Sequence, residues 1–308
     1  MPESSLRDTF GDYIVTFGKQ NKNIVVLDAD LSSSTRTSKF AKIFPDRFFN
    51  MGIAEQNMLG TALGFAISGK IPIVSGFSIF TTGRAWEFIR SACHDKLNIK
   101  IITTHGGIIG EDGSSHNALE DLSLMATLPN IQIFIPADKF ELIKILEYSI
   151  KEQGPTYIRL PRGNFPEVHD ESYEFRVGKP ELIKEGEDIC LIGTGFGTCL
   201  AVKLVSELEK ELKISIRIVN LPSIKPIDEK LLIDVINDMK GIITIEEHNI
   251  YCGFGSIISR LVSDQFPIRI KTIGFKNTFG QSGKREILLD KYGLNKKTIS
   301  NKIREIID

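Results

Sequence analysis

Glu55 is the residue whose position in this sequence most strongly suggests chemistry. It opens a segment in which apolar residues return at helical spacing, so its carboxylate should lie in the first turn of an inward-facing helix. The apolar stripe consists of Leu59, Ala62 and Ala66, widened by Leu63 and Ile67. A buried carboxylate without a partner costs several kcal/mol or takes up a proton. We therefore expect Glu55 to bind a partner from outside its own helix.

A second group of reactive side chains lies in residues 110–116, which read Gly-Glu-Asp-Gly-Ser-Ser-His. This segment brings two carboxylates, including Asp112, and His116 onto flexible backbone near the carboxyl end of a strand expected at 99–103. His105 lies at its other end. Such a loop is a candidate functional site. Taken alone, it could equally be the polar start of a helix that one of its serines caps.

Other candidate residues have ordinary interpretations when each is taken alone. Phe77 and Phe80 would by default be core aromatics, and most arginines would be solvated or paired at the surface. Arg162 differs because it ends a predicted strand beside a proline and a glycine. The glycine-rich turn at 193–197 follows a strand and opens a helix, but its spacing departs from a dinucleotide-binding fingerprint. Tight turns of this kind need glycine in any case, so we interpret it as structural.

Alternating apolar strands and amphipathic helices must position these residues. Helices are expected at 6–17, 55–67, 83–95 and 140–151, and strands at 24–27, 48–51, 71–74, 99–103, 131–135 and from 156 onward. The polar loop 28–35 follows the first of these strands, where ligand loops of parallel sheets often lie. The alternation predicts an α/β fold whose parallel sheet is covered on both faces.

The periodic pattern lapses in a charged stretch containing proline and glycine, which we interpret as a domain boundary. The expected division is a first domain at 1–165, a linker at 166–186 and a smaller α/β domain at 187–308. Strands of the second domain are expected at 189–192, 214–219, 242–245 and 268–273.

Composition narrows the classes of partner. With 38 basic and 39 acidic residues the chain is nearly neutral, which favours neither nucleic acid nor an anionic membrane as its partner. Its 4 cysteines lack the paired spacing of a zinc site and are interpreted as reduced thiols. No apolar segment approaches the roughly 18 residues that cross a bilayer, and the amino terminus lacks signal-peptide features. We expect a cytoplasmic protein that acts on small molecules or other proteins.

Several of these segments together resemble a known family. In order and spacing, Gly52-Ile53-Ala54-Glu55-Gln56, the loop from Phe77 to Phe80, and Gly110-Glu111-Asp112-Gly113 with His116 resemble the pyrimidine-binding domain of transketolase. The resemblance extends to Phe279-Gly280-Gln281-Ser282-Gly283, which is similar to that family's C-terminal module. It implies two parallel-sheet α/β domains, a thiamine-diphosphate-binding (pyrimidine) fold followed by a transketolase C-terminal-like domain. The implied activity is transfer of a two-carbon ketol unit from a ketose phosphate to an aldose phosphate.

The resemblance also implies which residues bind the cofactor, thiamine diphosphate. The glutamate that matches Glu55 hydrogen-bonds a ring nitrogen of the cofactor's pyrimidine and promotes the tautomer that activates the cofactor. Matching positions would place Phe77 and Phe80 against the aminopyrimidine, and Asp30 near the cofactor.

Substrate contacts follow from the same resemblance. His105 would lie near the substrate carbonyl, while Asp112 and His116 would meet sugar hydroxyls, so the two histidines join Glu55 as candidates for catalysis. The residues that match the family's phosphate-holding positions are Arg7, Ser34 and Arg162. Guanidinium groups are well suited to phosphate.

The diphosphate half of the family's site has no counterpart in this sequence. The family holds Mg2+ and the diphosphate through Gly-Asp-Gly and a later Asn, and no such pair occurs here. The chain therefore looks like the C-terminal subunit of a split transketolase, inactive without a separate N-terminal, diphosphate-binding subunit that holds most of the Mg2+ contacts. The analogy also implies self-association into a two-fold assembly.

The sequence departs from the family pattern at three places. Ser114-Ser115 stand where the family usually has Pro-Thr, Gly83 replaces a third aromatic residue, and the interval from His105 to Asp112 is one residue longer. These departures leave the identity of the sugar open.

Other members of the same structural class are alternatives. A β subunit of a 2-oxoacid dehydrogenase has the same two-domain plan and glutamate, and deoxyxylulose phosphate synthase shares the fold but carries its diphosphate domain in the same chain. A non-catalytic scaffold subunit is the alternative from a different class. The acidic loop and the arginines favour the transketolase interpretation.

Overall fold

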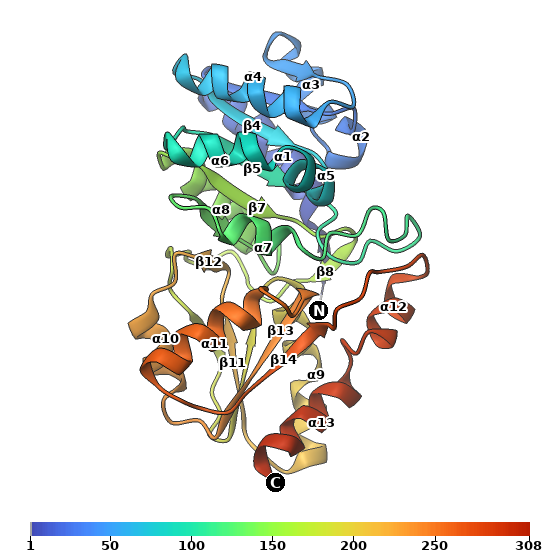
Figure 1. The fold of residues 1–308 in the computed structure, drawn as a ribbon, viewed down its shortest axis with the longest axis vertical. Helices are drawn as coiled ribbons and strands as arrows, with labels where there is room; N and C mark the ends of the chain where they lie inside the picture. The colour runs from blue at the N-terminus through green and yellow to red at the C-terminus, as the bar shows by residue number, and fades with distance from the viewer. Residues whose placement is uncertain (1) are drawn as a thin grey trace.

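A seven-stranded sheet forms the first domain of the computed structural model, which describes residues 2–308 (Figure 1). In spatial order its strands are β12 (Ser223–Lys225), β6 (Gln132–Phe134), β7 (Thr156–Arg159), β5 (Lys100–Thr103), β4 (Ile71–Ser75), β2 (Ile24–Asp28) and β3 (Phe48–Asn50). All neighbouring strands are parallel except β12, which runs antiparallel to β6. The predicted parallel sheet is confirmed, and its outermost strand comes from the second half of the chain.

Helices cover both faces of this sheet, as predicted. One face packs against α1 (Leu6–Gln20), α3 (Ser38–Ile43) and α8 (Lys139–Lys151), and the other against α4 (Glu55–Ile67), α6 (Trp86–His94) and α7 (Asp121–Ala126). Strand β2 shows how the sequence serves both layers, since Val26 packs into one core and Leu27 into the other. Successive strand residues point to opposite faces, so the apolar run is buried throughout.

Two details of the predicted helices were wrong. The helix expected at 83–95 starts only at Trp86, as α6, and ends at His94. Residues 78–84, which include most of the loop expected from Phe77 to Phe80, form a separate helix, α5 (Ser78–Arg84), and the buried residue Ala85 lies between the two helices. In α4, Ile67 is 73% exposed and does not widen the buried stripe, which consists of Met58, Leu59 and Ala62. The short helices α2 (Ser32–Thr35) and η1 (Pro45–Arg47) complete the N-terminal part.

The second domain contains a five-stranded sheet with all four predicted strands. Its order is β14 (Ile270–Phe275), β13 (Gly241–Asn249), β10 (Ile189–Gly193), β11 (Ile216–Asn220) and β9 (Glu181–Lys184). Strand β9 lies within the range expected as a linker and pairs antiparallel with β11, whereas the other pairs are parallel. The accompanying helices are α9 (Phe196–Leu212), α10 (Glu229–Ile236), α11 (Phe254–Gln265), α12 (Arg285–Lys291) and α13 (Lys296–Ile307).

The glycine turn at 193–197 is structural, as interpreted from the sequence. A Cβ atom on Gly197 would lie 2.0 Å from the carbonyl oxygen of Ile245, and one on Gly193 would lie 2.4 Å from the backbone nitrogen of Thr198. Glycine is therefore required for α9 to approach the sheet closely.

The first strand of the chain pairs with a strand at the end of the first domain. Strand β1 (Glu3–Ser5) pairs antiparallel with β8 (Asn164–Pro166), with Ser5 opposite Asn164. The Ser5 hydroxyl accepts a hydrogen bond from the Asp8 backbone nitrogen and caps α1. This pairing joins the segments that carry Arg7 and Arg162, whose charges lie close enough to interact. Among residues 2–308, no helix is both long and apolar enough to span a membrane.

A buried ion pair fastens the two domains together. The Nε atom of Arg159 donates to Oδ2 of Asp121 at 2.7 Å, and Nη2 donates to the carbonyl oxygen of Glu247 in β13 at 3.1 Å. Arg285 in turn binds the Glu247 carboxylate at 2.7 Å. The same carboxylate accepts from the backbone nitrogen of Ile108 at 2.9 Å, so the loop after β5 is held by the second domain.

A second buried network joins α8, the connecting segment and β9. His169 hydrogen-bonds Asp138 through Nδ1 and Glu181 through Nε2, each at 2.9 Å. Glu141 accepts from Tyr173 at 2.6 Å and from Asn220 at 2.7 Å. Burial raises the pKa of Glu141 to about 7, despite the opposing charge of His169 and these hydrogen bonds.

Candidate active site

Glu55 begins helix α4 and is 5% exposed, so the predicted burial of this carboxylate is confirmed. Gly52, three residues earlier, has a φ of +70° and turns the chain into the helix. Free backbone N–H groups at a helix N-terminus favour a negative charge there. The carboxylate thus lies at the amino end of α4, and the apolar residues that follow it in the helix are packed in the core.

The partner of Glu55 in this chain is Arg84, which the sequence interpretation missed. Nη1 of Arg84 donates to Oε1 of Glu55 at 2.9 Å, while the arginine side chain stays 51% exposed. The guanidinium carbon also lies 4.3 Å from the centroid of the Phe80 ring. A signal was present in the sequence, because Phe80 and Arg84 stand four residues apart and share a helix face.

Four rings gather beside this ion pair. Phe77 and Phe80 stack with centroids 6.0 Å apart, and His105 stacks on Phe77 at 3.7 Å. His116 meets Phe80 edge-on at 5.1 Å and Phe77 at 6.1 Å. Phe77 and Phe80 are therefore more than core residues. They follow β4, and their rings contact the two histidines that follow β5.

His105 is held as a neutral imidazole. Burial, together with the nearby positive charges of Arg7, Arg162 and His116, lowers the pKa of His105 to about 3. Its Nδ1 atom and the Thr104 hydroxyl lie 2.7 Å apart and share a hydrogen bond. The backbone of His105 has a φ of +63°, which turns the ring back onto Phe77. A neutral ring nitrogen can hydrogen-bond a substrate oxygen without carrying charge into the site.

The acidic loop is an irregular connection that runs along the second domain. Asp112 forms an ion pair with Arg162, whose Nη1 also donates to the Ile109 carbonyl oxygen at 3.3 Å. The Gly110 carbonyl accepts from the Gly283 nitrogen at 3.4 Å. Figure 1 shows this loop, coloured teal to green, projecting beside α12. Residues after β14 therefore help to shape the loop.

Arg7 and Ser34 come together at the other side of the site. Nη1 of Arg7 donates to the Ser34 carbonyl oxygen at 3.0 Å. Burial lowers the pKa of Arg7, and the charges of Arg36 and Arg162 add to this effect. Burial is the larger cause, and the smaller charge effects arise because the guanidinium groups of Arg36 and Arg162 lie close enough to Arg7 to repel it. An anion such as phosphate would relieve that repulsion.

Asp30 lies at the surface and is joined to the helix entrance by Asn50. The Oδ1 atom of Asn50 accepts from the backbone nitrogens of Asp30 at 3.1 Å and Gly52 at 3.0 Å. Asp30 itself has a φ of +63°. It is thus connected through Asn50 to the turn before Glu55, but it shares no direct contact with the four rings among the hydrogen bonds and ring contacts of residues 2–308.

One cluster of side chains has the spacing of metal ligands. Within residues 2–308, the three-residue group of His, Cys, Asp or Glu that could hold a metal is Glu141, His169 and Glu181. It belongs to the interdomain network, where both ring nitrogens of His169 already have carboxylate partners. The candidate active site lacks such a group among the residues that the structure describes.

Fold, buried glutamate and aromatic loop point to one family. Residues 3–168 match the pyrimidine-binding domain of transketolase, and residues 178–299 match the transketolase C-terminal domain. The chain therefore belongs to the transketolase family.

Individual relatives match this chain over nearly its whole length. It is 41% identical over 306 residues to a protein of Methanocaldococcus jannaschii named for a transketolase C-terminal section, covering 97% of this chain and 95% of that protein. It is 30% identical over 310 residues to a 6-deoxy-6-sulfo-D-fructose transketolase subunit of Clostridium sp., covering 100% and 96%. A 1-deoxy-D-xylulose-5-phosphate synthase of Carboxydothermus hydrogenoformans is 33% identical over 99% of this chain, but only 49% of that enzyme is matched.

Solved structures of transketolases also resemble this chain. A split-gene transketolase, described as an inactive beta4 tetramer, superposes with a TM-score of 0.89 at 41% identity and covers 98% of both chains. Transketolase of Campylobacter jejuni gives a TM-score of 0.83 at 22% identity and has 47% of its chain covered, which supports the shared fold.

Proposed function

We propose that this chain is the pyrimidine-binding subunit of a two-subunit, thiamine-diphosphate-dependent transketolase. The complete enzyme transfers a two-carbon ketol unit from a ketose phosphate to an aldose phosphate. A separate subunit holds the cofactor's diphosphate and Mg2+, and the assembly has two-fold symmetry. The observation that carries the proposal is the buried carboxylate of Glu55 beside the stacked rings of Phe77 and Phe80.

The residues present fit an aminopyrimidine ring. A flat heteroaromatic ring can pack against Phe80 and Phe77, and a carboxyl group at the helix end can hydrogen-bond a ring nitrogen. When bound, thiamine diphosphate supplies the carbon nucleophile and the electron sink of the reaction. Glu55 would hold the proton at the pyrimidine nitrogen, and the rings of Phe77 and His105 would exclude water from that side.

The substrate side of the site fits a phosphorylated sugar. Arg7 and Arg162 offer guanidinium groups for the phosphate, with Ser34 alongside. Asp112 and His116 stand on the loop where sugar hydroxyls would bind, and neutral His105 can donate or accept near the carbonyl. Support for a separate partner comes from relatives that are themselves named as a subunit, a C-terminal section or a split-gene product.

Reconstitution tests the proposal. The chain is mixed with a protein from the same source that bears the Gly-Asp-Gly and Asn motifs, thiamine diphosphate and Mg2+, and ketol transfer between ketose and aldose phosphates is followed by product analysis. Activity is expected only in the complete mixture, and chelation of Mg2+ should abolish it. Activity with pyruvate instead of a ketose phosphate would favour the synthase or dehydrogenase alternatives. An assembled complex that neither binds the cofactor nor turns over would indicate a scaffold subunit.

A further inference from the structure

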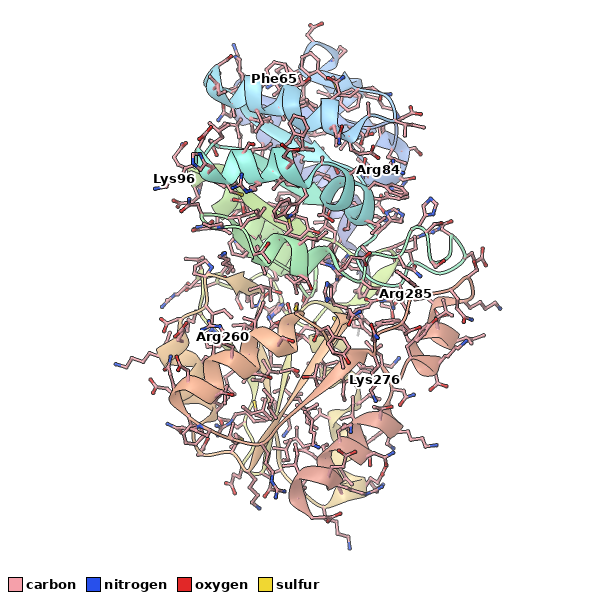
Figure 2. All side chains as sticks on the ribbon, in the orientation of Figure 1. Phe65, Arg84, Lys96, Arg260, Lys276 and Arg285 are labelled. Carbon is pink, nitrogen blue, oxygen red and sulfur yellow. The ribbon has the colours of Figure 1, made fainter. Side chains whose placement is uncertain are left out.

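Arg84 contacts two residues of the candidate site, Glu55 and Phe80. Its Nη1 atom donates to Glu55 at 2.9 Å, and its guanidinium carbon lies 4.3 Å from the Phe80 ring centroid. Figure 2 shows Arg84 on the flank of the first domain from which the acidic loop projects. One planar group therefore occupies both a face of the aromatic pair and the hydrogen-bonding edge of the buried carboxylate.

These are the two contacts that the proposed function assigns to the cofactor's aminopyrimidine. A guanidinium is planar, stacks on aromatic faces and donates hydrogen bonds to carboxylates, so it imitates such a ring closely. We propose that Arg84 occupies the pyrimidine position in the subunit without cofactor, and that the cofactor displaces it from Glu55 and Phe80. This inference rests on the proposed function.

The surroundings of Arg84 allow such a displacement. The residue ends α5, and its backbone carbonyl accepts from the Gln56 side chain at 3.2 Å, which fixes the main chain. The side chain itself is 51% exposed and can change rotamer into solvent. Glu55 stays buried, but the guanidinium that pairs with it is half in contact with water, so a ligand that satisfies the carboxylate can replace it. Arg84 is thus a positioning residue that holds Glu55 and Phe80 in place until the cofactor arrives.

Competition of this kind weakens apparent cofactor affinity, because only molecules with Arg84 displaced can bind. In the assembled complex, we expect Arg84→Ala to lower the dissociation constant of thiamine diphosphate about threefold to tenfold. Isothermal titration calorimetry in the presence of Mg2+ measures this directly. Arg84→Lys, which keeps the charge but loses the planar fork, should give an intermediate constant. Arg90→Ala, an exposed arginine on α6, is the matched control and should leave the constant unchanged.

A double-variant cycle separates this role from a general structural one. In a Glu55→Gln background, Arg84→Ala should change cofactor affinity by less than twofold, because the ion pair has already been removed. Unchanged or weakened binding by Arg84→Ala alone, or an equal change in both backgrounds, would overturn the inference while leaving the proposed function intact. A wild-type complex that does not bind thiamine diphosphate at all would overturn the proposed function and this inference with it.

Discussion

Arg159 and Asp121 form an ion pair that lies entirely inside the protein, with Nε and Oδ2 2.7 Å apart and side-chain exposures of 6% and 0%. Tyr157 donates a further hydrogen bond to the same carboxylate oxygen at 2.6 Å. Arg159 also donates a hydrogen bond to the Glu247 carbonyl oxygen. Its guanidinium group therefore stabilises both the core of the first domain and the contact between the two domains. Loss of the arginine would leave a buried carboxylate unpaired.

Arg159→Met is therefore expected to lower the free energy of unfolding by about 3 to 5 kcal/mol. Urea denaturation followed by circular dichroism measures the change. Arg176→Met is the control, since the pair that Arg176 forms with Glu174 is exposed and should contribute at most about 1 kcal/mol. Equal losses for the two variants would contradict the assigned role of Arg159.

The interdomain network predicts a pH dependence of stability. Burial lowers the pKa of His169, but hydrogen bonds to Asp138 and Glu181 outweigh this and raise the pKa to about 10. Since the folded pKa lies above the ordinary value near 6.5, this contribution to stability is fully present below about pH 6.5 and is lost as pH rises through about 10. The melting temperature should fall between pH 7 and pH 10 in differential scanning calorimetry. His169→Gln should fall less over the same range, and parallel curves for both proteins would refute the prediction.

Glu55 is expected to be indispensable to the reconstituted enzyme. Glu55→Gln keeps the shape of the side chain but removes its proton exchange, and general acid–base groups contribute roughly 10²- to 10⁴-fold to rates. The expected loss of ketol transfer is in that range. Glu87→Gln changes an exposed glutamate in the first turn of the neighbouring helix α6 and should retain near wild-type activity. Full activity of Glu55→Gln would exclude the proposed mechanism.

Arg162 is expected to contribute to recognition of the phosphate group. Arg162→Gln removes a charged donor and should raise the KM for a phosphorylated ketose about tenfold or more, because hydrogen bonds to charged groups contribute about 1.5 to 3 kcal/mol. The KM for the same ketose without its phosphate should change much less. Arg176→Gln serves as the exposed control. An equal rise in KM for both sugars would mean that Arg162 stabilises the loop through its ion pair with Asp112 and does not bind the phosphate.

Local sequence patterns predicted most of the fold because each strand and helix carries its own periodicity. The burial of Glu55 followed from the apolar residues after it, and the glycine turn at 193–197 was predicted to be structural from its spacing and from the need for glycine in tight turns. Arg84 was missed because its partner lies 29 residues away, with helix α4, strand β4 and helix α5 spanning the interval. The stacking of His105 on Phe77 depends on a left-handed backbone conformation that the sequence does not reveal for a non-glycine residue.

Local sequence patterns also could not predict which strands pair when the strands are far apart in the sequence. Strand β12 has three residues and shows no period, yet it crosses from the second half of the chain to pair with β6. The ribbon of β1 and β8 likewise joins segments that are far apart in sequence. Nothing within such short segments identifies a partner strand, since pairing depends on where the folded domains meet.

The crossing of β12 also determines how this protein can be dissected. If the first domain were produced without residues 223–225, β6 would become a bare sheet edge whose unpaired N–H and C=O groups invite strands from other molecules. The excised second domain would carry the complementary loose strand. Fragments cut within 166–186 should therefore aggregate or exchange strands, and crystallographic or engineering work on either half should retain its neighbour.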